Sequence, residues 1–154
     1  IGRAKLFFIN SLIKFLNINC LNNYFNIDVL VINETELRQE LRENKLDLNI
    51  LAKILIKKNK IKNLIVTKGK AGVLLYKKNS KPIFCPAFVS QSVDKVGAGD
   101  AMLSISSLAI KQGLDPELVL FLGSIAAAIS VNNIGNKICV NINDLDRIIE
   151  HMLK

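Results

Sequence analysis

Two glycines and an aspartate form the part of the sequence with the clearest chemical potential. Gly97, Ala98, Gly99 and Asp100 run directly into a long apolar pattern of helical spacing. Free backbone N–H groups at the start of a helix attract anions such as phosphate, and glycine lets a ligand approach closely. Asp100, ionised at pH 7, could accept a proton from a hydroxyl group. An anion site beside a base predicts attack of a hydroxyl on a phosphoryl group.

The same four residues also have a purely structural interpretation. Asp100 could cap the helix, and Gly97 and Gly99 could form the turn that leads into it. Short glycine motifs often arise without any ligand. On these residues alone, the base and the cap remain equal alternatives.

The elements that would position this loop alternate along the chain. Short β-branched runs predict buried strands at residues 27–33 and 64–67, and the segment around Asn79 and Ser80 predicts a hairpin. Helical spacing predicts helices at residues 34–44, 48–58, 101–112, 116–132 and 142–153. In the second of these helices, Leu51, Ile54 and Leu55 are expected to lie on one face. The alternation predicts an α/β fold with a parallel sheet covered by helices on both faces.

Three loops of this predicted fold deserve comparison. The segments NETE, TKGKAG and VGAGD each follow a predicted strand or an extended segment. Ligands of open α/β sheets gather at the carboxyl ends of the strands. We therefore expect the three loops to meet at one end of the sheet.

Composition argues against several other classes of protein. The formal charge is +8, but the lysines are scattered among isoleucines and asparagines without interleaved aromatic residues for base stacking. The three cysteines are far apart and accompanied by one histidine, which favours reduced thiols in a cytoplasmic protein over a zinc site. The longest apolar run, Leu118–Val131, is shorter than a bilayer requires and predicts a buried helix. We therefore expect neither a nucleic-acid partner nor a membrane.

Four motifs together resemble the PfkB (ribokinase-like) family of carbohydrate kinases. The segment DKVGAGDAM resembles the family's Asp-Thr-x-Gly-Ala-Gly-Asp signature, with Lys95 where threonine is usual. NETE resembles its Asn-x-x-Glu motif, and TKGKAG its nucleotide loop Thr-x-Gly-x-x-Gly. GSIAAAISVNNIGN resembles the small-residue helix and glycine turn beside the adenine. The motifs occur in family order across residues 28–136.

The resemblance implies a fold and an activity. The fold would be a ribokinase-like three-layer α/β sandwich with a mostly parallel sheet, and residues 1–154 would form one domain that carries ATP binding and the catalytic base. The activity would be ATP-dependent phosphorylation of a hydroxyl on a sugar or sugar phosphate, with Mg²⁺ as cofactor. The similarity is greatest to the heptose-phosphate kinase branch, the kinase half of ADP-heptose synthase.

The resemblance also assigns roles to individual residues. Asp100 would be the base, and Gly97, Ala98 and Gly99 the anion hole. Asn33 would organise magnesium and phosphate, together with Glu36, which would act through water. Other residues would bind the nucleotide, namely Thr67, Lys68, Gly69, Gly72, Gly123, Ser124 and Ala127. Some relatives bind a monovalent cation such as K⁺, whose ligand positions here are Asp94, Val96, Ser130, Asn133 and Gly135.

Each of these assignments has a structural alternative. Glu36 could simply occupy a favourable helix start, and Thr67 and Gly69 could merely end a strand. The alanines near Ala127 could serve close helix packing, and Lys68 could be an ordinary surface lysine.

The chain departs from the family in length. A kinase of this type is about twice as long, and the amino-terminal half, with most sugar contacts and the lid, is missing here. We expect either a fragment or a split enzyme whose other half is a separate polypeptide, and a homo-oligomer is a further option. A non-catalytic nucleotide-binding or assembly module that kept the fold is the alternative function.

Overall fold

The computed structural model describes residues 6–8, 20–88, 97–132, 143, 146, 147, 149 and 150. The strands are β1 (Leu6–Phe8), β2 (Val29–Asn33), β3 (Asn63–Thr67), β4 (Val73–Lys77) and β5 (Ile83–Cys85). The helices are η1 (Cys20–Asn23), α2 (Glu34–Leu41), α3 (Leu48–Asn59), η2 (Gly69–Ala71), α4 (Ala98–Lys111) and α5 (Pro116–Asn132). No helix among these residues is long and apolar enough to cross a membrane.

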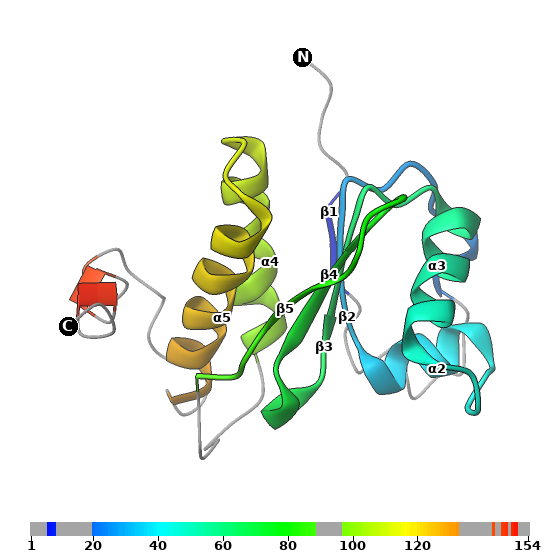
Figure 1. The fold of residues 1–154 in the computed structure, drawn as a ribbon, viewed down its shortest axis with the longest axis horizontal. Coiled ribbons are helices and arrows are strands. Elements are labelled where there is room, and N and C mark those ends of the chain that lie inside the picture. The colour runs from blue at the N-terminus through cyan, green and yellow to red at the C-terminus, as the bar shows by residue number, and fades with distance from the viewer. Residues whose placement is uncertain are drawn as a thin grey trace.

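The strands form one sheet in the order β1-β2-β3-β4-β5. β1, β2 and β3 are parallel, whereas β4 and β5 return as an antiparallel hairpin, so the sheet is mixed. Figure 1 shows α2 and α3 on one face and α4 and α5 on the other. The predicted three-layer α/β architecture and the hairpin at Asn79 are therefore confirmed.

Each face of the sheet buries its own apolar cluster. Leu30, Ile32 and Leu64 point toward α2 and α3, while Val31 and Ile65 point toward α4 and α5. This alternation follows from the period of two along a strand, and it explains why β2 and β3 read as continuous apolar runs. The two clusters fix both helical layers against the strands that end at Asn33 and Thr67.

The packing of α3 differs in one residue from the expectation. Leu51 and Leu55 are fully buried, but Ile54 is 42% exposed. The buried positions recur at residues 48, 51, 52, 55, 56 and 59, and position 54 lies outside that stripe. The prediction that Ile54 lies on the same face as Leu51 and Leu55 was therefore wrong.

A buried asparagine ties the segment before β2 to the end of α3. The Asn59 side chain is fully buried, and its Nδ2 donates to the carbonyl oxygens of Leu21 at 2.6 Å and Tyr24 at 2.8 Å. The Asn59 carbonyl accepts the N–H of Asn26 at 3.0 Å. These bonds satisfy backbone groups of a segment that sequence patterns did not place, including η1.

The edge strand β5 is short for a visible reason. Pro82 precedes it and Pro86 follows it, and neither residue has a backbone N–H to donate. Proline in a sheet is tolerated at such edges and ends of strands. The hairpin therefore closes this side of the sheet with only three residues.

Candidate functional site

The three predicted loops line one cleft of about 900 Å³ at the carboxyl ends of β2 and β3. This is the lower end of the sheet in Figure 1, where α2 and α4 begin. Asn33 and Thr67 are paired across the two strands, so their loops start side by side. The cleft brings together most of the predicted site residues, namely Asn33, Glu36, Thr67, Lys68, Gly69, Gly72, Ala98, Gly99, Ser124 and Ala127.

The NETE segment builds the start of α2 as a capping box. The Asn33 side-chain oxygen accepts the Glu36 N–H at 2.8 Å, and Glu36 Oε2 accepts the Asn33 N–H at 3.0 Å. Glu36 is only 8% exposed, yet it lines the cleft. The Asn-x-x-Glu spacing thus has a structural role of its own, which sequence reasoning had not assigned.

The acidic groups of the cleft limit how a magnesium ion could bind. Within the described ranges, no group of three or more His, Cys, Asp or Glu side chains could hold a metal ion. Magnesium commonly takes one or two carboxylates and completes its shell with waters and phosphate oxygens. Glu36, a single carboxylate that lines the cleft, fits that mode.

The start of α4 provides backbone N–H groups at the cleft. Gly97 is the N-cap, with a φ of +86° that favours glycine, and the first helical bond runs from Ala101 N–H to Gly97 O at 2.9 Å. The N–H groups of Ala98, Gly99 and Asp100 precede that bond and have no acceptor within the helical ladder. Ala98 and Gly99 line the cleft, whereas Gly97 does not. The assignment of Gly97, Ala98 and Gly99 as an anion hole stays a prediction.

Asp100 lies in the first turn of α4 and is exposed. The structural alternative, in which Asp100 caps this helix, is wrong because Gly97 is the N-cap. Asp100 is not among the residues that line the cleft, although Gly99 beside it is. Its backbone carbonyl accepts the Ser104 hydroxyl at 2.8 Å. The assignment of Asp100 as the base stays a prediction.

The nucleotide-loop glycines differ in how tightly they are packed. Lys68 N–H donates to Gly72 O at 2.8 Å and closes the loop around η2. Gly72 has a φ of +91°, and a Cβ there would collide with the carbonyl oxygen of Cys85 and the ring of Phe84. Gly69 has a φ of +58°, with open space around its Cα. Lys68 is exposed at the mouth of the cleft.

Gly72→Ala is expected to lower the free energy of unfolding by roughly 2–4 kcal/mol, because it adds backbone strain and overpacking. Gly69→Ala is the matched control and should cost about 1 kcal/mol, the cost of a left-handed conformation alone. Urea unfolding of the two variants measures the difference. Equal losses would contradict the packing of Gly72 on β5.

The cleft has an apolar wall that the sequence patterns did not reveal in full. Ser124 and Ala127 of α5 line it as expected, and they are joined by other apolar residues, namely Met102, Pro86, Ala87, Phe88, Ala128 and Val131. The Phe88 ring packs edge-on against Phe121 at a centroid distance of 5.5 Å. The wall combines the segment after β5 with one side of α5 and with Met102 of α4, and only the tertiary fold brings these together.

Gly123 lies outside this wall. Its Cα faces the Ser106 hydroxyl and Met102 of α4, so the absence of a side chain allows the two helices to pack closely. Behind the wall, burial raises the pKa of the free Cys85 thiol, whose Sγ donates to the carbonyl oxygen of Pro86 at 3.6 Å. A neutral thiol suits the apolar surroundings.

The predicted cation site is mostly outside the described residues. Asp94, Val96, Asn133 and Gly135 belong to that part of the chain. Ser130 is described and is buried in α5. The predicted helix at residues 142–153 is described at five positions, which are helical.

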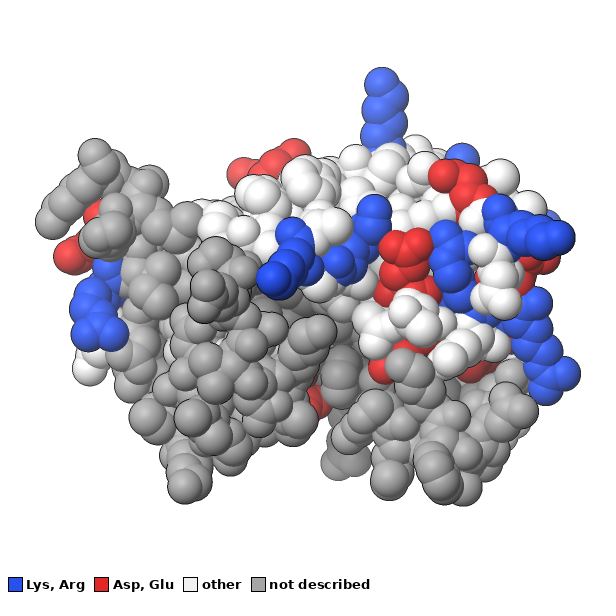
Figure 2. All heavy atoms as spheres, turned by 90° about the horizontal axis from the view of Figure 1, so that it is seen from below, with Lys and Arg blue, Asp and Glu red and all other residues white. Residues whose placement is uncertain are grey.

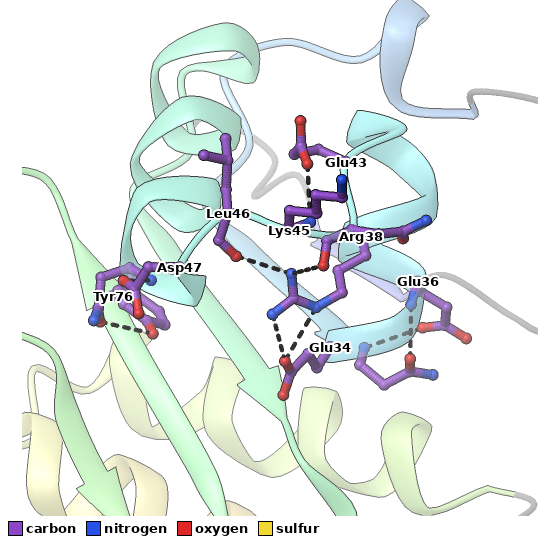
Figure 3. Close-up of polar contacts among 11 residues, drawn as sticks. Glu34, Glu36, Arg38, Glu43, Lys45, Leu46, Asp47 and Tyr76 are labelled. Carbon is purple, nitrogen blue, oxygen red and sulfur yellow. Dashed lines mark hydrogen bonds and ion pairs between the residues drawn. The ribbon is translucent and has the colours of Figure 1, made fainter.

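The sequence patterns did not predict one ion pair, which lies on the α2 side of the cleft. Arg38 and Glu34 lie one turn apart on α2, with Arg38 Nη2 2.8 Å from Glu34 Oε1 (Figure 3). Arg38 Nη1 also donates to the carbonyl oxygens of Leu46 at 3.0 Å and Asn44 at 3.3 Å. Figure 2, which views the molecule from the cleft end, shows basic and acidic side chains interspersed over this side. The i, i+4 spacing was a signal that could have found the pair.

Comparison with known proteins identifies the family. The model described as pfkB family carbohydrate kinase matches residues 5–143. The chain belongs to the pfkB family. Among curated pfkB relatives, bifunctional protein HldE of Haemophilus ducreyi is 34% identical over 88 residues, which are 57% of this chain and 18% of the relative. The Bacillus subtilis ribokinase is 38% identical over 72 residues, or 47% of this chain and 24% of the ribokinase.

Solved structures share the fold of the chain. Ribokinase from Thermotoga maritima matches with a TM-score of 0.70 and 29% identity over 80% of this chain and 42% of its own. Arabidopsis thaliana ribokinase, solved with ribose and ATP, has a TM-score of 0.70 and 25% identity, over 84% of this chain and 42% of the ribokinase. The expected ribokinase-like fold is thus confirmed. The chain spans less than half the length of these pfkB-family structures and about a fifth of the curated relatives.

Proposed function

We propose that this chain carries the ATP-binding and catalytic part of a kinase that phosphorylates a hydroxyl of a sugar or sugar phosphate. The observation that carries the proposal is the meeting of two helix starts, α2 and α4, with the Thr67–Gly72 loop in one cleft. Helix starts and free backbone N–H groups favour anions, so the cleft suits a polyphosphate. The family of the chain makes ATP and a sugar hydroxyl the natural pair of substrates.

The proposed roles follow the positions of the residues. The N–H groups of Ala98 and Gly99, with Gly97 shaping the turn, would hold the phosphoryl oxygens as negative charge develops on them. Asp100 would accept the proton of the attacking hydroxyl. Thr67, Lys68, Gly69 and Gly72 would border the phosphates and ribose. Asn33 and Glu36 would hold magnesium, which when bound neutralises charge on the phosphate oxygens.

The apolar wall suits the nucleobase of ATP. Ser124, Ala127 and Phe88 border it. Gly123 would contribute indirectly, because its lack of a side chain lets α5, which carries Ser124 and Ala127, pack close to α4. A monovalent cation at Asp94, Val96, Ser130, Asn133 and Gly135 belongs to the same proposal.

The substrate branch and the partners are finer parts of the proposal. Matches to proteins named bifunctional protein HldE support a heptose-phosphate substrate over other sugars. Sugar contacts would come from a further polypeptide segment, from a separate amino-terminal half or from a second copy. A cytoplasmic location fits these substrates. The exposed position of Asp100 outside the cleft favours the second candidate, a nucleotide-binding module without catalysis.

Calorimetry with Mg-ATP tests the nucleotide assignment. We expect a dissociation constant of roughly 1 µM to 1 mM, the range usual for enzyme substrates. Gly99→Asp should weaken binding at least tenfold, because it puts a carboxylate among the N–H groups that would hold phosphate. The same change suits a helix start, so the fold should persist. A folded wild-type chain that binds no Mg-ATP would refute the assignment.

A further inference from the structure

We propose that Arg38 is a positioning residue that neutralises Glu34, so that a polyphosphate can approach the start of α2. This inference rests on the proposed function, since it concerns the same cleft and its anionic ligand. Arg38 and Glu34 both line the cleft, beside Asn33 and Glu36. Arg38 lies outside the motifs that point to nucleotide binding, and Glu34 occupies an unspecified position of the Asn-x-x-Glu motif.

The start of α2 contains an electrostatic conflict. Glu34 is the first residue of the helix, where a carboxylate stabilises the positive end of the helix dipole. A polyphosphate seeks the same positive end, so an unpaired Glu34 would repel it. Glu36 already adds a second carboxylate to this turn, whereas Lys68 and Lys70 supply positive charge across the cleft.

The geometry of Arg38 resolves this conflict. Its Nε and Nη2 donate to the same Glu34 oxygen at 3.2 and 2.8 Å, and both side chains are sheltered, with 23% and 31% exposure. Figure 3 shows the guanidinium held between Glu34 and the loop that ends at Asp47. An ion pair with this shelter is screened less than one in open water. α2 therefore keeps a favourable carboxylate at its first residue, while the ion pair reduces the negative charge that Glu34 presents to the cleft.

The charge of Glu34 also affects Tyr76 of β4, outside the cleft. The pKa of Tyr76 is raised to about 12, first by burial, then by Asp47 and Glu34. The Tyr76 hydroxyl itself donates to Asn49 Oδ1 at 3.1 Å. The carboxylates of this region therefore act beyond their direct contacts.

A structural role for Arg38 is the competing explanation. Its Nη1 holds the loop between α2 and α3 through the carbonyl oxygens of Asn44 and Leu46. A residue that only latches this loop would affect all ligands of the cleft alike. A residue that neutralises Glu34 would affect ligands in proportion to their negative charge.

The test measures dissociation constants of ATP, AMP and adenosine for the wild-type chain and its variants by calorimetry. Arg38→Gln should weaken ATP binding by roughly 3–10-fold and AMP binding by less. The dissociation constant of adenosine should stay within about twofold of the wild-type value. Adding Glu34→Gln to that variant should restore ATP affinity, since the repelling charge has gone. Arg38→Lys, which keeps the charge without the planar fork, should retain most of the affinity.

Equal weakening of binding for all three ligands, or no recovery of ATP affinity in the double variant, would overturn the proposal. Arg38 would then only hold the loop between α2 and α3. If Arg38→Gln does not fold, Glu34→Gln is the deciding variant. It leaves the positive charge of Arg38 unpaired beside the cleft, so ATP binding should tighten and adenosine binding should stay unchanged. An unchanged ATP affinity in Glu34→Gln then overturns the proposal. A wild-type chain that binds none of the three ligands instead refutes the proposed function.

Discussion

Asp100→Asn is expected to lower the rate of phosphoryl transfer by roughly 10²–10⁴-fold, because the amide cannot accept the hydroxyl proton. The rate is best measured in a protein with the full length of its relatives, with ATP and sugar phosphates as substrates. Binding of ATP should persist or tighten slightly, since a negative charge near the phosphates is removed.

The structure sharpens the control for this experiment. Since Gly97 is the N-cap of α4, loss of the Asp100 carboxylate removes only a favourable charge in the first turn, about 0.3–1 kcal/mol. Glu117 is an exposed acid in the first turn of α5 and does not line the cleft. Glu117→Gln should therefore match the small change in stability and leave the rate intact. A wild-type rate in Asp100→Asn would rule out Asp100 as the base.

Glu36→Gln should separate the metal role of this residue from its capping role. Glutamine also completes a capping box, so the melting temperature should stay near that of the wild type. A group that orients metal ligands through water typically contributes 10–100-fold to affinity or activity. We expect a loss of that size at limiting Mg²⁺, with partial recovery as Mg²⁺ is raised.

The measurement is the rate as a function of Mg²⁺ concentration. Glu43→Gln is the control, because Glu43 is only partly buried and its carboxylate accepts the N–H of Lys45 outside the cleft. If Glu36→Gln has the wild-type Mg²⁺ dependence, the carboxylate serves only to cap α2. Glu36→Ala should then be destabilising without any further effect on metal dependence.

The sequence was informative where one local rule decides the structure. The runs before Asn33 and Thr67 predicted strands because both faces of β2 and β3 are covered and must be apolar. The predicted loops meet because parallel strands end at the same edge. The start of α4 was misplaced by three residues, since Gly99 was taken for part of the loop, although of Gly97 and Gly99 only Gly97 has a positive φ.

Other features depend on tertiary contacts that a single sequence does not display. β1 has three residues and is defined by its pairing with β2, so no pattern predicted it. The predicted helix after β2 ends three residues early, where Arg42 adopts a left-handed conformation. Phe88 and Arg38 enter the cleft from segments that only the folded sheet brings together. Their side-chain types alone gave no sign of this placement.

The prolines beside β5 also determine the direction in which this sheet can grow. An incoming strand needs a row of backbone donors and acceptors, and Pro82 and Pro86 interrupt that row on both sides of a three-residue strand. Association of two molecules edge to edge is therefore disfavoured at β5. Among the described strands, β1 is the other edge, with β2 as its neighbour. Any additional strand, from this polypeptide or another, would extend the sheet beyond β1.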